Sequence, residues 1–447
     1  MNRAWLFPPL LVSLMLAPPG LIPSPAGAQP RSELAQGLPS PVTGRVLSLK
    51  EALDIALETQ PTIQARVGDY AAARQRVDQA FSGLLPQLGG SWSALREQTV
   101  ETLARSSTGK TSTITEWSTT TTAKVTLSQL LFDFGKTVAA TDAAKAGAEV
   151  SREDVEIERD ATVLLVKESF FNLLFGKRLV VVNQEAVARA QLNLRSAKGF
   201  FEVGTRPKFD VTRAEVDLAN AQLTLIQAKN AERLARVALN TAMGISIDSP
   251  TEVQDILTYE AFPLDESRLL GEALQRRPEN RQVKVRVEAA EATVRQTFRN
   301  FFPDITGNAF YGGARADMNE IWELGVSLNW SIFDGGNKIA RYKEAKASLE
   351  AAQSRVRAQE LAIWKEVEQA HLNVSESEQR IQAAKKAVEA AQENFRLAQG
   401  RFDAGVGTII ELTDAQLALT QAQSTEAQAL TDYRIAVSRL ERALGRR

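Results

Sequence analysis

The chain has 447 residues, with 53 Lys and Arg, 54 Asp and Glu, one histidine and no cysteine. The lack of cysteine excludes disulfides, thiol catalysis and cysteine-based metal sites, and the single histidine, His371, excludes a histidine-rich metal centre. A net charge of −1 gives no electrostatic reason to expect a nucleic-acid partner. The sequence contains no catalytic constellation, so we expect no enzyme activity, no cofactor and no metal site.

The first residues predict a secretory signal peptide. Arg3 precedes an apolar stretch at residues 5–16, and an A-x-A cleavage motif ends at Ala28. A membrane anchor is the alternative, but its unbroken apolar part is too short to span a bilayer, because it is interrupted by Pro8, Pro9, Pro18 and Pro19. We predict that residues 1–28 are removed and that residues 29–46 form an N-terminal extension. An exported chain without cysteine suits the bacterial cell envelope.

The remaining chain contains one sequence pattern twice. Two constant offsets, 201 and 217 residues, relate its halves, as in the pairs Phe132 and Phe333, Gly204 and Gly405, Pro61 and Pro278, and Pro86 and Pro303. The two offsets differ because the first copy has a longer segment between Gly90 and Phe132. We predict repeat 1 at residues 47–245, a linker at 246–264 and repeat 2 at 265–447.

Each repeat has the same predicted order of elements. A short opening helix leads to a helix at residues 61–85 or 279–302, and then to strand-like segments. A long helix follows at about 136–201 or 338–402, and a last helix at 207–243 or 409–444. At 1.5 Å per residue each long helix extends about 100 Å. The two shorter helices together match the long one in length, which predicts an elongated helical body with helices stacked end to end.

One apolar stretch, at residues 161–182, is long enough to raise the question of a transmembrane helix. It contains Lys167, Glu168, Lys177 and Arg178, and its counterpart at 362–383 is polar. Charged residues within a membrane span are costly. We therefore predict a buried packing segment.

Two hairpins are predicted, at about residues 87–132 and 304–333, with a Ser/Thr-rich loop at 106–113 in the first. In the second hairpin apolar residues alternate with polar ones, giving one face made of Trp322, Leu324, Val326, Leu328, Trp330 and Ile332. Its two tryptophans are separated by about 20 Å of height on a tilted strand, which is close to the spacing of the aromatic girdles of a membrane barrel. The first hairpin keeps the alternation at Ala123, Val125, Leu127 and Leu131, with Gln129 as an exception.

The alternation has two interpretations, a membrane barrel with a lipid-facing apolar side or a soluble hairpin lying on a core. Secretion, duplication and alternation together favour the barrel. Four strands cannot close a barrel, and open strand edges are not tolerated in lipid. A dimer would give eight strands, whose interior is filled by side chains, whereas a trimer would give twelve strands and leave a lumen. We therefore predict a homotrimer. Asp133 and Asp334 precede the long helices and are predicted N-caps.

At this point a family resemblance becomes specific. The duplicated plan, the F-D-x-G motif at each strand-to-helix junction and the stretch at residues 402–414 resemble the TolC-like outer membrane efflux protein family. The resemblance covers nearly all of the mature chain. It implies a mostly α fold with a membrane β-barrel, in which a trimeric 12-stranded β-barrel continues into a long periplasmic α-helical barrel with an internal two-fold repeat.

The resemblance also implies a function and partners. The implied function is that of a passive exit duct in the Gram-negative outer membrane, as part of a tripartite efflux or type I secretion system. The implied partners are a periplasmic adaptor (membrane fusion protein) and an inner-membrane RND or ABC transporter. Outer-membrane lipid would surround the barrel. The alternative class is a soluble periplasmic coiled-coil adaptor or scaffold, which the alternating strand and the duplication speak against. The cargo is set by the transporter.

The family places acidic residues in a ring at the periplasmic entrance, at the start of the last helix. Glu411 and Asp414 match those positions, and their counterparts in repeat 1 are Asp210 and Arg213. For Glu411 a capping box with Thr408 is an equally good explanation. The family latch uses a tyrosine and an arginine where this chain has Phe402 and Gly407, so we do not expect a latch of that form.

Overall fold

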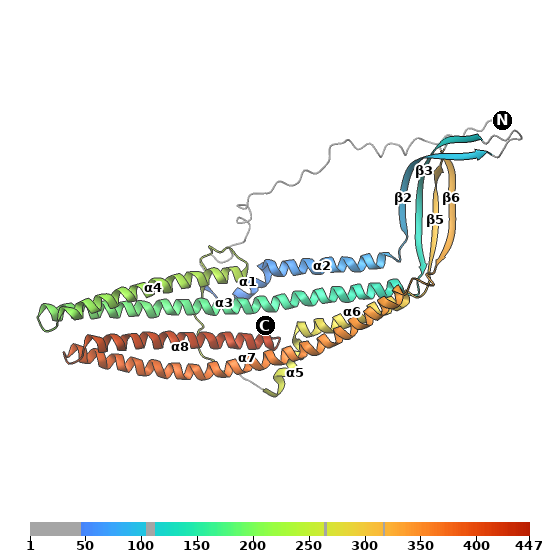
Figure 1. Cartoon of the computed structure of the whole chain (residues 1–447). Helices are drawn as coiled ribbons and strands as arrows, with labels where there is room; N and C mark the ends of the chain where they lie inside the picture. The colour runs from blue at the N-terminus through green and yellow to red at the C-terminus, as the bar shows by residue number, and fades with distance from the viewer. Residues whose placement is uncertain (1–45, 104–111, 263–265, 316–317) are drawn as a thin grey trace.

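A computed structural model describes residues 46–103, 112–262, 266–315 and 318–447. The predicted signal peptide, the extension up to residue 45 and most of the predicted 106–113 loop lie outside the described residues. The molecule is elongated, with helical hairpins at one end and a sheet at the other (Figure 1). The same order of elements, two helices, two long strands and two helices, occurs in each half of the chain.

The helices of the first half are α1 (Leu49–Thr59), α2 (Pro61–Ser82), α3 (Lys136–Glu202) and α4 (Lys208–Met243). Those of the second half are α5 (Glu266–Arg276), α6 (Pro278–Arg299), α7 (Asn337–Asp403) and α8 (Ile409–Ala443). Helices α3 and α7 each have 67 residues. Helices α4 and α2 lie one after the other along α3, as the matched lengths predicted (Figure 1). Helices α2 and α6 end three residues before the predicted position, because the residues ahead of Pro86 and Pro303 form turns with hydrogen bonds to the third residue back, as from Leu85 N–H to the Ser82 carbonyl oxygen.

The described strands include a four-stranded antiparallel sheet in the order β2-β3-β5-β6. Its strands are β2 (Gln87–Leu103), β3 (Ser112–Phe132), β5 (Asp304–Ala314) and β6 (Asn319–Asn329). Strands β2 and β6 form its open edges. Strands β5 and β6 are shorter, so the outer part of the β2–β3 hairpin extends beyond them (Figure 1).

Two predictions at the strand ends were wrong. Trp330 and Ile332, predicted to continue the alternating strand, follow the end of β6 at Asn329. The indole Nε1 of Trp330 donates to the carbonyl oxygen of Phe301 at 3.0 Å, so this side chain is tied to the segment after α6 and not to the sheet. Ser112 and Thr113 begin β3, although both were predicted to lie in the loop.

The two faces of the sheet differ in chemistry. Residue pairs in register place exposed large apolar side chains on one face, namely Leu88, Trp92, Val125, Leu127, Tyr311, Trp322, Leu324, Val326 and Leu328. On the other face, polar side chains form hydrogen bonds from strand to strand. Ser128 Oγ donates to Asn308 Oδ1 at 3.1 Å, and Asn308 Nδ2 donates to Ser327 Oγ at 3.0 Å. The sheet therefore has an apolar exposed face and a hydrogen-bonded polar face.

Gln129, the exception in the predicted alternation, connects the sheet to a helix. Its amide Nε2 donates to the carbonyl oxygen of Leu84 at 2.7 Å, just after the end of α2, and to that of Leu130 at 2.9 Å. The register of β3 and β5 shifts between Leu130 and Phe132. A polar side chain at this position therefore satisfies backbone carbonyls where the chain leaves the sheet.

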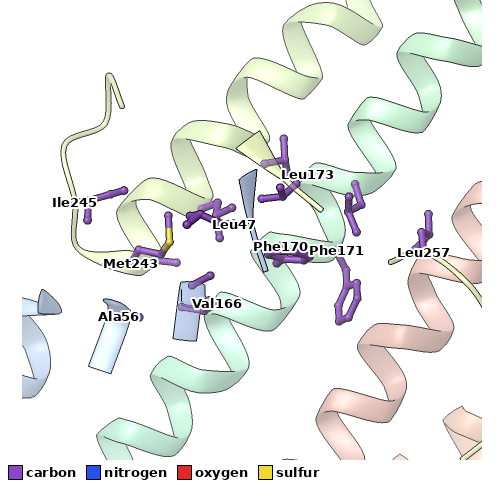
Figure 2. Close-up of a cluster of buried hydrophobic side chains, with 14 residues drawn as sticks. Leu47, Ala56, Val166, Phe170, Phe171, Leu173, Met243, Ile245 and Leu257 are labelled. Atoms are coloured by element: carbon purple, nitrogen blue, oxygen red, sulfur yellow. The ribbon is translucent and has the colours of Figure 1, made fainter. Parts of the chain in front are cut away.

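The predicted linker contains an unpredicted strand. Strand β4 (Glu252–Val253) pairs in parallel with β1 (Val46–Leu47). Beside it lies a cluster of buried apolar side chains in which Val166, Phe170 and Leu173 of α3 meet Leu47 and Met243 (Figure 2). The 161–182 stretch is therefore a packing segment, as predicted. Among the described helices, none has an apolar run long enough to cross a membrane.

Ion pairs connect the two halves of the chain. Lys167 Nζ lies 2.7 Å from Glu441, and Arg281 Nε lies 2.9 Å from the buried Glu153. A further buried pair lies within the second half, where Arg277, with 3% of its side chain exposed, lies 3.0 Å from Glu279. Burial alone raises the pKa of Glu279, but the hydrogen bond and charge of Arg277 outweigh it and lower that pKa. Such pairs need both partners, because removing one leaves a buried charge uncompensated.

Candidate functional site

The α3–α4 turn and the α7–α8 turn lie at the helical end of the molecule, far from the sheet (Figure 1). Gly204 and Gly405 have φ angles of +76° and +81° in these turns. Glycine adopts this left-handed conformation without steric cost and so ends the long helices where predicted. These two turns form the distal tip, and they carry the residues predicted to surround an entrance.

The acidic pair predicted from the resemblance lies at the start of α8. The Glu411 backbone N–H donates to Thr408 Oγ1 at 3.2 Å, which is one half of a capping box. The Glu411 carboxylate lies 3.6 Å from Arg401 Nε and is half-exposed. Asp414 is exposed one turn further on and lines a groove of about 610 Å³ between α3, α4 and α8. Neither carboxylate is buried, so both are available to solvent.

The counterparts in the first half differ from this pair. Asp210 is buried and lies 3.3 Å from Arg206 Nη1. Arg213 is exposed, with its Nε 3.7 Å from Asp217. Asp217, which the sequence did not single out, accepts a hydrogen bond from Thr413 Oγ1 at 2.9 Å and lines the same groove as Asp414. Of the predicted entrance residues, the exposed acids are thus Glu411 and Asp414 of the second half, whereas Asp210 is engaged by an arginine.

Sequence reasoning missed Arg206, which joins the two turns. Its Nη2 donates to the carbonyl oxygens of Phe402 at 3.2 Å and Gly407 at 2.7 Å. Its guanidinium lies 4.2 Å from the centroid of the Phe402 ring. We call Arg206, Asp210, Phe402 and Gly407 the tip clasp. The 201-residue offset pairs Arg206 with Gly407. This difference between the two repeats, an arginine in one and a glycine in the other, is the sequence signal that could have pointed to Arg206.

The predicted caps Asp133 and Asp334 lie two residues before the N-cap positions, which are Gly135 and Gly336. Even so, the Asp133 carboxylate accepts from the backbone N–H of Gly135 at 2.9 Å and of Thr137 at 2.6 Å, and Asp334 accepts from that of Lys338 at 3.1 Å. Burial raises the pKa of Asp133, but these hydrogen bonds and the charge of Lys136 outweigh it and lower the pKa. Both aspartates therefore accept hydrogen bonds from backbone N–H groups at the helix start, but from a position two residues further upstream than predicted.

Comparison with known proteins settles the family. The outer membrane efflux protein family matches residues 52–245 and 269–446. The chain belongs to this family. It is 25% identical over 382 residues to the outer membrane efflux protein BepC of Brucella suis, and the aligned region covers 82% of this chain and 78% of BepC. It is 23% identical over 422 residues to the outer membrane protein TolC of Escherichia coli, and here the aligned region covers 89% of this chain and 82% of TolC.

The fold is similar to that of a solved structure, the CmeC outer membrane channel of Campylobacter jejuni. The TM-score is 0.75 at 19% identity, and the match covers 89% of this chain and 85% of CmeC. This outer membrane efflux protein therefore has the mostly helical, TolC-like fold that the resemblance implied. It is a Gram-negative outer-membrane efflux channel, and the alternative of a soluble adaptor is not supported by these relatives.

Proposed function

We propose that three copies of this outer membrane efflux protein form one 12-stranded barrel that continues into a helical tunnel. The open edges β2 and β6 carry the proposal, because an unpaired strand edge cannot persist in lipid. Pairing β6 of one copy with β2 of the next closes the sheet. The exposed apolar face then lies toward lipid, and the face bearing Ser128, Asn308 and Ser327 lines the lumen.

Helices with unpartnered apolar faces support the same assembly. Helix α6 packs against both α3 and α7, whereas α2 packs extensively against α3 alone. Val67 and Phe81 of α2 are exposed, and α4 exposes Phe209, Val216 and Leu223 at seven-residue intervals. A seven-residue apolar repeat is the seam of a coiled coil. We propose that α2 and α4 pack against α7 of the next copy, since α7 exposes Ile339, Leu361 and Leu372.

The proposed trimer works as a passive duct. It would receive cargo from an inner-membrane RND or ABC transporter through a periplasmic adaptor that meets the distal tip. The inner-membrane transporter then supplies both the energy and the choice of cargo. The tip is the part of the duct furthest from the outer membrane, so the adaptor would bind there.

Extraction and conduction test this proposal together. We expect the protein to leave outer membranes only with detergent, to give a trimer mass in native mass spectrometry and to conduct ions in planar bilayers. A stable monomer in detergent that retains its full β content would contradict the proposal, because a single chain leaves two strand edges unpaired.

The entrance charge gives a second expected result. In a trimer, Glu411 and Asp414 would form two stacked acidic rings one helical turn apart, and a narrow mouth focuses such charge. We expect the double change Glu411→Ala, Asp414→Ala to lower cation preference and abolish block by trivalent cations added at the tip side. Planar-bilayer reversal potentials measure this directly.

Thr408→Ala is the matched control for helix capping. It removes the hydroxyl that accepts from Glu411 N–H and costs about 0.5–2 kcal/mol of helix stability, but it leaves both carboxylates in place. We expect its selectivity to equal that of the unmodified protein. Unaltered selectivity and block in the double variant would show that the acids serve capping alone.

A further inference from the structure

The sheet carries two cationic side chains that stack on aromatic rings, one on each of its faces. Arg96 lies 5.1 Å from the ring centroid of Trp117, and Lys124 Nζ lies 5.1 Å from that of Phe310. Strand parity separates them. Arg96 has the same parity on β2 as the exposed Leu88 and Trp92, whereas Lys124 has the same parity on β3 as Ser128, whose hydroxyl belongs to the polar face.

Lys124 occupies a position that its neighbours constrain. Its partner in register on β5 is Gly312. A Cβ added at Gly312 would lie 2.7 Å from the Lys124 Cα and 2.1 Å from the Ala123 carbonyl oxygen, so a larger residue does not fit there. From this position the lysine side chain reaches the ring of Phe310, two residues before Gly312 on the same strand. Among the described residues no carboxylate forms an ion pair with Lys124, so its charge is held by an aromatic face.

We propose that Lys124, repeated three times around the closed barrel, forms a basic ring in the lumen that attracts small polyvalent anions carrying carboxylate or phosphate groups. The inference rests on the proposed trimer, which turns the polar face into the lumen. The ring would lie in the barrel, at the opposite end of the duct from Glu411 and Asp414 (Figure 1).

Glu323 has to be included in this argument. It faces the same side and is the partner in register of Phe310 on β6, so Phe310 stands between the lysine and the carboxylate. The two charges act in opposite directions on a passing ion. Neutralising Lys124 should shift the permeability ratio toward cations, and neutralising Glu323 should shift it toward anions. Both shifts should shrink at 1 M salt, where the Debye length is only about 3 Å.

Citrate block of the trimer in planar bilayers tests the ring. With citrate added at low salt on the barrel side, we expect Lys124→Gln to raise the half-blocking concentration about tenfold, as a Coulomb estimate with screening suggests. Lys124→Arg keeps the charge and should restore the block. Arg96→Gln, which removes a cation from the opposite face of the same hairpin, should leave it unchanged.

Cysteine substitution tests the facing separately, because the chain has no cysteine of its own. In lipid, a charged, membrane-impermeant thiol reagent should modify Lys124→Cys and change the current, but it should not react with Val125→Cys on the adjacent, apolar side. A conducting trimer whose citrate block survives Lys124→Gln, or in which only Val125→Cys reacts, would overturn the ring alone. Failure to obtain a conducting trimer would overturn the proposed function, and the ring with it.

Discussion

Replacing Val326 by arginine is expected to destabilise the assembled barrel by about 2–4 kcal/mol, because a charged side chain would be placed in lipid near the middle of the membrane. The Val326 side chain is 71% exposed in the single chain and lies on the face with Leu324 and Leu328. Leu328→Arg should cost less, because Leu328 lies closer to the helical end of β6, and the penalty falls toward the interface. The measurement is the trimer yield and its denaturant midpoint in lipid bilayers or detergent.

Gly325→Arg is the matched control for Val326→Arg. Gly325 is the adjacent residue on the polar face, and a Cβ added there meets nothing within 4 Å. Ser327 is a poorer control, because its hydroxyl is hydrogen bonded to Thr306 and Asn308. We expect Gly325→Arg to assemble normally. Equal losses in the Val326 and Gly325 variants would show that the assignment of the two faces is wrong.

The tip clasp gives the second large effect. Arg206→Ala would leave the buried Asp210 without its partner and remove the donor that reaches Phe402 and Gly407. Losing one partner of a buried ion pair typically costs about 3–5 kcal/mol. Because the contacts are confined to the tip, we expect faster amide hydrogen exchange in both turns and a higher basal conductance of the trimer. The sheet and the α3–α6 contacts should keep their exchange protection.

Two further variants sharpen the test of the clasp. Arg206→Lys keeps the charge but loses the planar fork that spans two carbonyls, so its exchange rates should fall between those of the unmodified protein and Arg206→Ala. Arg213→Ala removes a half-exposed partner of Asp217 and should change stability by no more than about 1 kcal/mol. Identical exchange at the tip in Arg206→Ala and Arg213→Ala would rule out a role for Arg206 in joining the turns.

The helices and the facing of the sheet were predictable from local patterns. Helix boundaries are marked by Pro61, Pro278, Gly204 and Gly405. Proline fixes its own φ angle and lacks an N–H donor, whereas glycine can adopt the positive φ angle that ends a helix. Alternation at residues 322–328 assigned the four apolar side chains, Trp322, Leu324, Val326 and Leu328, to one face, because successive residues of a strand point to opposite sides. Such signals act over a few residues and can be read from the chain directly.

Local alternation failed where a distant partner competed for the side chain. Trp330 continues the apolar alternation in sequence, but its indole donates to Phe301 instead, and β6 ends before it. The two-residue strands β1 and β4 are too short to produce a period, and they form because residues about 200 positions apart meet beside a buried cluster. Asp210 matched an exposed acid in the alignment of the repeats, but Arg206 holds it in a buried contact.

The sequence by itself determined the lengths of the two long helices, the duplicated order of elements and the two chemically distinct faces of the hairpins, because each depends on the spacing of residues along one segment. Only the tertiary structure decided what happens at the distal tip. There, Arg206 contacts carbonyl oxygens 196 and 201 residues away, and no local spacing encodes such a contact. It arises because two separate turns are brought together by the packing of α3 against α8 along the body of the molecule.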